Sequence, residues 1–375
     1  MRVLFLESEA LTAETRIVPL LDALRASGRI DGFACVDRGL AITGGSFDAY
    51  DVALTHRNPS ARQVAWLRRN SLPFVYDVDD LLLAAPDQPL SARRRAERAG
   101  IIWCLSHARR ITSPSSRLLR VLAERAQVGL EGRSVIVPNT GLEHPPPPKS
   151  GVRPRLLWVS SDVLRFSDQE FEAVRAGIAA GVADHALDCL LLGRFPQAVR
   201  DALGRPEHKT WMPHARYRHC LAEGNFIAVA PLARDLPAAQ QCAIDCKSDI
   251  KAAEFGSSRI AAAYSAARPY AESDLPCDLV AENSASHWRD AVGRLVATFP
   301  EAGNRLGDHP AFALRRPSVV ALRLFECLEA ARAGAPPVRY RALATPRFVR
   351  NLARNLRGLR MRLSPGRPKS RSAGD

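Results

Sequence analysis

The sequence predicts an α/β protein with two Rossmann-like domains, and three observations indicate this fold class. Over residues 1–140, short apolar runs typical of strands alternate with segments whose apolar residues recur at helical spacing. The run Pro145–Pro148 then breaks the pattern, because consecutive prolines favour an extended linker. Beyond it the alternation begins again. Strands that alternate with helices form parallel sheets covered on both faces, so we expect two such units in series.

The first unit is predicted to span residues 1–140. Its apolar runs predict strands at Val3–Leu6, Gly32–Val36, Asp51–Thr55, Pro73–Tyr76 and Ser134–Val137. Helical spacing predicts helices over 13–26, 60–70, 92–107 and 115–126. In the first of these helices the apolar residues fall on one face, which we expect to pack on the sheet.

A linker over 141–152 leads to a second unit over 153–334. We expect strands at Arg155–Val159, Leu187–Gly193, Lys209–Trp211, Asn225–Ala230 and Arg259–Ala263. Helices are expected over 169–180, 214–222, 248–255, 284–298 and 318–333. Two Rossmann-like units leave a cleft between them, and open α/β sheets bind ligands at the carboxyl ends of their strands.

Composition narrows the class of protein. The 375 residues suit two domains with a core each. No apolar run is long enough to cross a bilayer, and Glu7 interrupts the N-terminal run too early for a signal peptide, so we expect a cytoplasmic protein. The eight cysteines are scattered in apolar contexts, which favours buried free thiols. Cys242 and Cys246 could share a helix face, but no further His or Cys pair at metal-ligand spacing accompanies them, so we expect no metal site.

The basic charge is concentrated in the segment 335–375. This segment has eleven Lys and Arg residues and one acid, and so accounts for ten of the net +14 charge. On a helix over 347–363, the apolar residues from Phe348 to Leu363 fall in one sector and Arg347, Arg350 and Arg354 lie opposite. Such a cationic amphipathic helix favours peripheral binding to an anionic membrane surface. A nucleic-acid-binding arm or a helix docked on the body remains an alternative.

The stretch from Lys247 to Glu254 has the residue types of an anion site. If it is helical, Lys247, Lys251 and Glu254 share one face. Ser248 then caps the helix, whose free N–H groups and partial positive charge suit a diphosphate. A carboxylate two turns in can accept hydrogen bonds from ribose hydroxyls. An ordinary solvated helix with a lysine face explains the same spacing.

Several short motifs follow one another along residues 1–330. They are Thr15-Arg16, Tyr50 to Arg57, Val75 to Asp80, Ile111 to Ser116, Val135 to Asn139, Ala230 to Leu232, Lys247 to Gly256, and Trp288. In this order they resemble the glycosyltransferase group 1 (family 4) branch of the GT-B enzymes, in its lineage with a Lys-Ser-x-x-Lys-x-x-Glu motif. The resemblance implies a GT-B fold, with Glu254 at the ribose of the donor nucleotide.

The resemblance also implies an activity. It indicates a hexosyltransferase-type glycosyltransferase of polysaccharide biosynthesis, which moves a sugar from a nucleotide-sugar donor to a glycan or lipid-linked acceptor. Such enzymes retain the anomeric configuration and use neither metal nor cofactor, since the nucleotide-sugar is a co-substrate. Two departures stand out: Cys246 occupies the position of a second Glu, and the loop that begins at Ser160 and Ser161 lacks a usual Lys. We expect Ser160, Ser161, Lys247 and Lys251 to bind the phosphates.

Polar residues also follow two strands of the first unit. Asp77, Asp79 and Asp80 come after the strand at 73–76, and we expect Asp79 and Asp80 to hold acceptor or sugar hydroxyls. A metal clamp of Asp77 and Asp79, or capping aspartates, are the alternatives. His56 is a candidate for proton transfer, or a structural histidine. Arg57 is a candidate partner for an anionic acceptor group.

Trp211 is a candidate to stack on the nucleotide base, or a core residue. Cys246 and the missing Lys leave a second hypothesis, a degenerate GT-B homologue that binds a sugar nucleotide or glycan without catalysis. A nucleic-acid-binding protein ranks last, because the chain lacks interleaved aromatic residues and a helix-turn-helix pattern.

Overall fold

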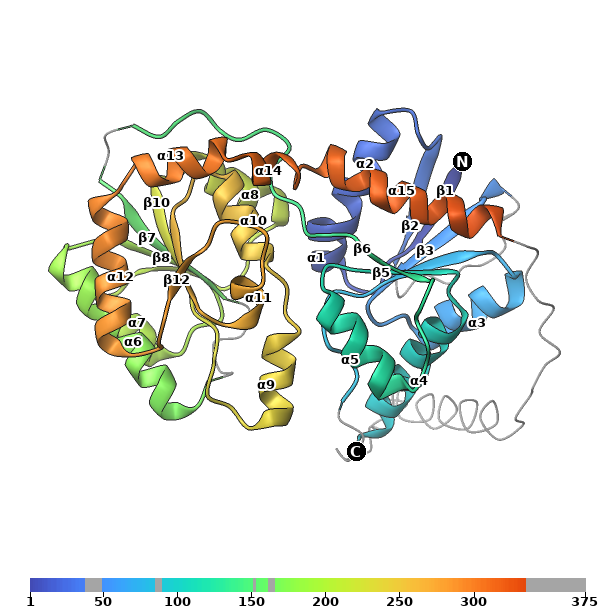
Figure 1. The fold of residues 1–375 in the computed structure, drawn as a ribbon, viewed down its shortest axis with the longest axis horizontal. Helices are drawn as coiled ribbons and strands as arrows, with labels where there is room; N and C mark the ends of the chain where they lie inside the picture. The colour runs from blue at the N-terminus through green and yellow to red at the C-terminus, as the bar shows by residue number, and fades with distance from the viewer. Residues whose placement is uncertain (38–48, 85–89, 151–152, 161–165, 335–375) are drawn as a thin grey trace, which may run out of the picture. The chain divides into compact units, whose positions relative to one another are not determined.

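A computed structural model describes residues 1–37, 49–84, 90–150, 153–160 and 166–334. Met1–Gly334 forms one compact unit and holds two six-stranded sheets (Figure 1). All ten strand pairings are parallel. The predicted α/β fold with two Rossmann-like domains is therefore confirmed. The segment 335–375, including the predicted amphipathic helix, lies outside the described residues.

The first sheet has the strand order β2-β1-β3-β4-β5-β6. Its strands are β1 (Arg2–Leu6), β2 (Gly32–Val36), β3 (Val52–His56), β4 (Phe74–Asp77), β5 (Arg110–Ser113) and β6 (Ser134–Ile136). The strand order reverses direction at β1, so β1 and β3 form its switch point. Five of the six strands match predicted ones. The sequence pattern missed β5, which is four residues long and begins with an arginine.

The second sheet has the order β12-β11-β10-β7-β8-β9, with its switch point between β7 and β10. Its strands are β7 (Arg155–Ser160), β8 (Cys189–Gly193), β9 (Glu207–Lys209), β10 (Phe226–Ala230), β11 (Ala262–Ser265) and β12 (Asp278–Val280). The predictions for β9 and β11 were displaced by two and three residues, and β12 was missed. These strands are short and therefore give weak alternation signals.

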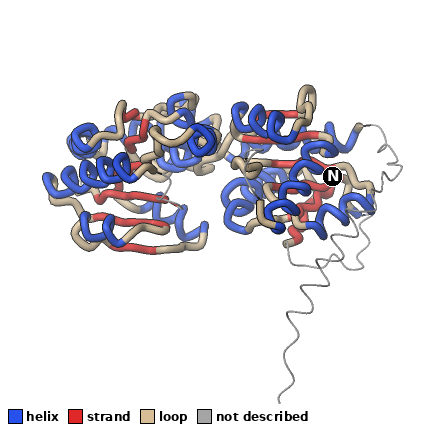
Figure 2. The backbone as a smooth tube through the Cα atoms, turned by 90° about the horizontal axis from the view of Figure 1, so that it is seen from below, coloured by secondary structure: helices blue, strands red, loops and turns tan. Residues whose placement is uncertain are grey.

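Helices cover both faces of each sheet (Figure 2). In the first half they are α1 (Ala10–Thr12), the π-helix η1 (Ala13–Ile17), α2 (Val18–Ala26), α3 (Ala61–Asn70), α4 (Ala92–His107) and α5 (Ser116–Ala126). Later in the chain they are α6 (Asp168–Asp184), α7 (Gln197–Ala202), α8 (His214–Glu223), α9 (Ala238–Asp245), α10 (Ile250–Ser257), α11 (Arg268–Ala271), α12 (Ala285–Ala297), α13 (Glu301–Asp308) and α14 (Pro310–Ala313), followed by α15 (Pro317–Ala333), which packs on the first sheet.

Alternate strand residues supply separate cores. Leu4 and Leu6 of β1 enter one apolar cluster, whereas Val3 and Phe5 enter another on the opposite face. The second sheet is likewise covered by two clusters, one with Trp158 and one with Leu157. Burial on both faces explains why these strands read as nearly continuous apolar runs.

Helix α15 corrects the predicted domain boundary. The prediction gave residues 318–333 to the second domain, because they follow it in sequence. The structure instead packs Val320, Leu324 and Leu328 of α15 into the cluster of Val3 and Phe5. The chain therefore crosses between the two sheets twice, once near Gly141 and once near Arg315. The apolar face of α15 is buried against the first sheet, and sequence spacing does not reveal which sheet a helix covers.

The described part of the linker, residues 141–150, has no regular secondary structure and is bound to the second domain. Lys149 Nζ donates to the carbonyl oxygens of Ala222 and Gly224 at 2.6 and 2.7 Å, near the C-terminus of α8. Arg259 Nε donates to Pro146 O at 2.7 Å. The segment with the proline run is thus held in place by charged side chains on backbone carbonyls.

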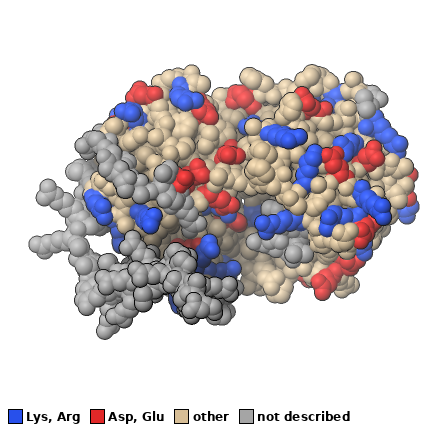
Figure 3. Space-filling model, turned by 180° about the vertical axis from the view of Figure 1, so that it is seen from behind, with Lys and Arg blue, Asp and Glu red and all other residues tan. Residues whose placement is uncertain are grey.

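The eight cysteines have free thiols, as predicted, but only four of them are buried; three are partly buried and Cys35 is exposed. Among the described residues, no helix has both the length and the apolar character that a membrane span requires. On the face drawn in Figure 3, the visible Lys and Arg side chains are interspersed with Asp and Glu, and no single sign of charge fills it. This mixture agrees with the modest net charge expected outside 335–375.

Candidate functional site

A pocket lies at the carboxyl ends of strands from both sheets. Ser160 ends β7, Pro231 follows β10 and Arg57 follows β3, and all three line it. Further lining residues are Asp79, Asp80, Val159, Phe166, Leu232, Ala233, Ile244, Lys247, Ser248, Ile250, Lys251 and Tyr270. The pocket therefore touches the switch points of both sheets, where open α/β proteins bind ligands. We call it the charged pocket.

Two lysines form the basic side of the charged pocket. Lys251 lies in the first turn of α10, and Lys247 lies in the short connection between α9 and α10. Among the residues that the structure describes, neither ammonium group has an ion-pair or hydrogen-bond partner. Burial lowers the pKa of Lys251 to about 8; Glu254 opposes this shift, and the neighbouring Lys247 adds a smaller decrease. The site thus concentrates positive charge that an anion would neutralise.

The start of α10 differs from the prediction. The helix begins at Ile250 instead of Ser248, and no side chain caps it. Asp249 occupies the N-cap position, but its carboxylate accepts from Arg315 Nη2 at 2.8 Å and from Ser273 Oγ at 2.7 Å. Because these partners hold Asp249, it does not turn back to the helix N–H groups. Ser248 therefore does not cap the helix, although it still lines the pocket.

Ser160 closes the same side of the pocket from β7. Gly193, its neighbour on β8, has φ +122°, and a Cβ atom there would lie 1.7 Å from Ser160 O. Only glycine permits this approach of the two strand ends. Ser161 lies outside the described residues.

The opposite side of the pocket is acidic. Arg57 Nη1 lies 3.3 Å from Asp79 Oδ1, and Arg57 Nη2 lies 3.6 Å from Asp80 Oδ2. The Nε atom of the same guanidinium lies 3.0 Å from Glu9 Oε2. Three carboxylates therefore surround one cation. Burial raises the pKa of Asp79 to about 6, with Arg57 opposing the shift.

Asp77 does not join this acidic group. Its carboxylate accepts from Arg16 Nε and Nη2, both at 2.8 Å, and from Thr112 Oγ1 at 2.6 Å. Both partners of the ion pair have side chains 1% exposed. A carboxylate held in this way is not available to a metal ion, so the geometry does not support a clamp of Asp77 and Asp79. In the described part of the chain, no group of three or more His, Cys, Asp or Glu residues has a metal-binding arrangement.

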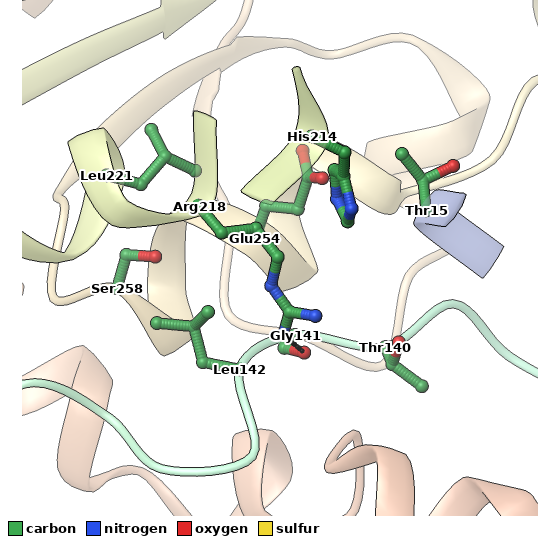
Figure 4. A pocket seen from close by; sticks show the side chains of 9 residues that line it. All are labelled: Thr15, Thr140, Gly141, Leu142, His214, Arg218, Leu221, Glu254 and Ser258. Atoms are coloured by element: carbon green, nitrogen blue, oxygen red, sulfur yellow. Dashed lines mark hydrogen bonds between the residues drawn. The ribbon is translucent and has the colours of Figure 1, made fainter. Parts of the chain in front are cut away.

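Glu254 lies in a second, narrower pocket next to the first. Thr15 and Thr140 line it from the N-terminal side, and Arg218 and His214 of α8 line it with Glu254 (Figure 4). Tyr217 Oη donates to Glu254 Oε2 at 2.9 Å. Burial raises the pKa of Glu254, while Lys251, Tyr217 and Arg218 oppose the shift. Lys251 and Glu254 therefore belong to one helix but line adjoining pockets.

Sequence reasoning did not find the α8 residues beside Glu254. The signal was present, because His214, Tyr217 and Arg218 have the i, i+3, i+4 spacing that places side chains on one helix face. Nothing in the sequence, however, indicated that this face meets α10. Figure 4 shows Arg218 and His214 beside Glu254 within one pocket.

Solved structures similar to this chain share its two-domain architecture. A glycosyltransferase from Rickettsia africae is 9% identical with a TM-score of 0.55, over 89% of this chain and 99% of that one. WaaG, a glycosyltransferase involved in lipopolysaccharide biosynthesis, is 10% identical with a TM-score of 0.55, over 86% and 99%. The chain has the GT-B fold. At this low identity the likeness shows the fold alone.

A protein described as an epimerase has a similar fold. A putative UDP-N-acetylglucosamine 2-epimerase from Listeria monocytogenes is 11% identical with a TM-score of 0.54, over 90% of this chain and 98% of that one. No protein-family model and no curated protein matches the chain.

His56, a predicted proton-transfer residue, lies behind the charged pocket of the GT-B chain. Its side chain is fully buried, and it is not among the residues that line either pocket. Burial lowers its pKa to about 4, against an opposing effect of Asp77, so the ring is neutral near pH 7. Nε2 is buried without a hydrogen-bond partner among the described residues. This placement favours the structural alternative.

Trp211 and Cys246 occupy opposite environments. Trp211 is 69% exposed, so it is not the core residue of the alternative interpretation, but it lines neither pocket. Cys246 is fully buried in an apolar cluster with residues of the first domain, such as Leu122. It therefore does not present its thiol to a ligand. Asp245 does not replace the missing Glu, because it pairs with Arg117 and Arg268 at 3.2 and 3.3 Å.

Proposed function

We propose that this GT-B chain is a glycosyltransferase that moves a sugar from a nucleotide-sugar donor to a hydroxyl of a glycan or lipid-linked acceptor. The observation that carries the proposal is the charged pocket. Two lysines without described partners line the same pocket as two aspartates, at the switch points of both sheets. A donor diphosphate suits the lysines, and a hydroxyl acceptor suits the carboxylates.

The proposed donor site extends from the lysines to Glu254. Lys247, Lys251, Ser248 and Ser160 contact the diphosphate in this proposal, and Glu254 accepts hydrogen bonds from the ribose. Lys247 and Lys251 neutralise the negative charge that grows on the leaving diphosphate, which lowers the barrier to transfer. In this proposal the exposed Trp211 stacks on the nucleotide base.

The proposed reaction retains the anomeric configuration and uses no metal ion. The pairing of Asp77 with Arg16 supports the absence of a metal ion, because it removes Asp77 from the three aspartates of residues 77–80 and leaves Asp79 and Asp80. The two lysines supply the positive charge that a metal ion provides in other sites. A donor phosphate oxygen then takes the proton of the incoming hydroxyl, and the protein orients both substrates.

The proposal also concerns the cellular localisation of the protein. We expect a cytoplasmic hexosyltransferase of polysaccharide biosynthesis that binds an anionic membrane surface through residues 335–375. A lipid-linked acceptor would lie at such a surface.

Binding without catalysis is the second candidate function. The burial of Cys246 favours it, because the resemblance to the group 1 (family 4) branch places a Glu at this position. Sugar contacts normally made there would then be lost. The resemblance of the fold to an epimerase adds a third outcome to the test.

A three-step experiment tests the proposal. The full chain is first screened with sugar nucleotides for thermal stabilisation, since a ligand at 100 times its Kd adds about 2.7 kcal/mol. The stabilising donor is then incubated with the protein in EDTA, and products are identified by NMR. Free sugar or a glycosylated acceptor supports transfer, and a changed sugar still attached to nucleotide indicates epimerisation. Donor binding with no product in an acceptor-rich extract supports the binding-only function.

A further inference from the structure

The cation on the acidic side of the charged pocket is already neutralised. Arg57 lies within 3.6 Å of Asp79 and Asp80 and at 3.0 Å from Glu9. Its Nη1 also donates to Thr12 Oγ1 at 3.1 Å. The sequence suggested that Arg57 binds an anionic acceptor group. Its contacts argue against that role, because three carboxylates and a hydroxyl occupy its donors.

The backbone fixes Arg57 in this position. The residue has φ +50°, in the left-handed region that is uncommon outside glycine. Its N–H donates to Asp77 O at 2.8 Å, and Tyr76 Oη donates to Arg57 O. Both contacts come from β4, the strand that also leads into Asp79 and Asp80. The guanidinium and the aspartates therefore form one preorganised unit rather than a mobile surface pair.

This unit keeps an excess of negative charge. With Asp79 and Asp80 ionised, one arginine leaves one negative charge on this side of the pocket, and Glu9, which pairs with Arg57 from outside the pocket lining, adds a second. Asp79 Oδ1 is buried and makes no hydrogen bond among the described residues. A ligand that donates a hydrogen bond to the carboxylates of Asp79 or Asp80, which line the pocket, would offset this excess charge, whereas a second anion would be repelled.

The two sides of the pocket therefore favour two ligand groups that differ in charge. Lys247 and Lys251 favour an anionic group, and Asp79 with Asp80 favours a neutral or cationic hydrogen-bond donor. The anionic group is the donor diphosphate in the function proposed above. The neutral or cationic group is then the acceptor.

We propose that the charged pocket selects acceptors whose receiving sugar is neutral or carries an ammonium group, and rejects sugars that carry a carboxylate or phosphate beside the receiving hydroxyl. Asp79 and Asp80 are the specificity-determining residues. Asp79 accepts a hydrogen bond from the receiving sugar, and Asp80 provides most of the repulsion, because its side chain is more exposed at 28%. This inference rests on the proposed transferase function.

The test uses matched acceptors and the stabilising donor from the screen. Octyl glucoside, glucosaminide and glucuronide, with their galacto counterparts, differ in charge within each set. We expect the full chain to use the neutral and amino acceptors at least tenfold more efficiently than the uronides, measured as kcat/KM. Asp80→Asn should narrow this ratio at least threefold, and Asp79→Asn gives a second variant at the same unit. Glu131→Gln, at an exposed position outside both pockets, should leave the ratio unchanged.

The possible results distinguish the inference about acceptors from the proposed function. Thermal stabilisation by the donor shows that a variant is folded before its ratio is compared. Uronides used as well as or better than the other acceptors, or no difference among the three, would overturn the inference. A ratio that is the same in wild type and both aspartate variants would overturn it too. Failure of every sugar nucleotide to bind would instead reject the proposed function.

Discussion

Arg315 Nη2 lies 2.8 Å from Asp249 Oδ2, and this ion pair joins the second crossing between the sheets to the start of α10. Arg315 also donates from Nη1 to Asn139 O at 3.1 Å and accepts from Gly141 N at 3.0 Å, both on the first crossing. Both crossings are therefore held together by one arginine beside the helix that carries Lys251. Arg315 is 5% exposed and Asp249 is 8% exposed.

The first prediction concerns this pair. Arg315→Met removes one partner and leaves the Asp249 carboxylate buried, so we expect a loss of about 3 to 5 kcal/mol in unfolding free energy. Urea denaturation measures it. Arg294→Met is the matched control, because its pair with Asp278 has both side chains about half exposed. That substitution should cost about 1 kcal/mol or less. Equal losses in the two variants would contradict the prediction.

The strength of the apolar pattern decided which strands could be predicted from the sequence. Long apolar runs such as those of β1, β8 and β10 were predicted because burial on both faces leaves a strong signal. The strands β5 and β12 were missed because a few residues carry little periodicity. The placement of α15 on the first sheet depends on shape complementarity between segments about 200 residues or more apart, which spacing along the chain does not encode.

The sequence likewise predicted some features of the candidate site and missed others. The motifs led to Lys247, Lys251, Asp79 and Asp80, which the structure brings to one pocket. They did not show that Arg57 is neutralised by three carboxylates. This failure has a physical reason. Whether an arginine forms ion pairs depends on which carboxylates the fold brings close to it, and the local sequence does not show this.

The second prediction concerns Glu254 and Tyr217. Glu254→Gln should weaken donor binding at least tenfold, because an amide accepts ribose hydroxyls less strongly than a carboxylate. Tyr217→Phe should weaken it less, but should cost about 1 to 3 kcal/mol of stability since a buried carboxylate loses its donor. Titration calorimetry and urea denaturation separate the two effects. Unchanged affinity in Glu254→Gln would place the ribose elsewhere.

The third prediction follows from the pKa of Lys251, which is lowered to about 8. Diphosphate binding requires the charged form, so donor affinity should fall as the pH rises from 7 to 9.5. Lys251→Arg keeps its charge over this range and should flatten the dependence. Calorimetry at a series of pH values measures both. A wild-type affinity that is constant with pH would show that Lys251 does not contact the diphosphate.

The same shift has an effect on stability in the absence of donor. The folded pKa lies below the unfolded value, so the unfolded chain binds more protons between about pH 8 and 10.5. Stability therefore rises with pH across this window. Lys251→Met should remove that slope and raise the melting temperature at pH 7. A lower melting temperature would mean that the aliphatic part of Lys251 contributes more than the buried charge costs.

The fourth prediction concerns His56, whose pKa is lowered to about 4. The unfolded chain binds more protons between about pH 6.5 and 4, so stability should fall as the pH drops through this range. The neutral His56 side chain should account for about 3 kcal/mol of this loss in unfolding free energy. His56→Gln should reduce the slope, leaving the share of His214, whose pKa is also about 4. Transfer activity should stay within about threefold of wild type. A loss of a hundredfold or more in a folded variant would restore a catalytic role.

The last prediction concerns residues 335–375, which hold ten of the fourteen net positive charges. Deleting them should release the protein from vesicles of anionic lipid while donor affinity stays unchanged, because each cation near such a surface contributes about 1 kcal/mol. Replacing Leu352, Leu356 and Leu359 with Ser keeps every charge and removes the predicted apolar face. Cosedimentation with vesicles should then weaken at least tenfold, since that face has acyl chains as its partner. Full vesicle binding by this variant, together with salt-sensitive binding to DNA, would instead assign the segment to electrostatic contact with nucleic acid.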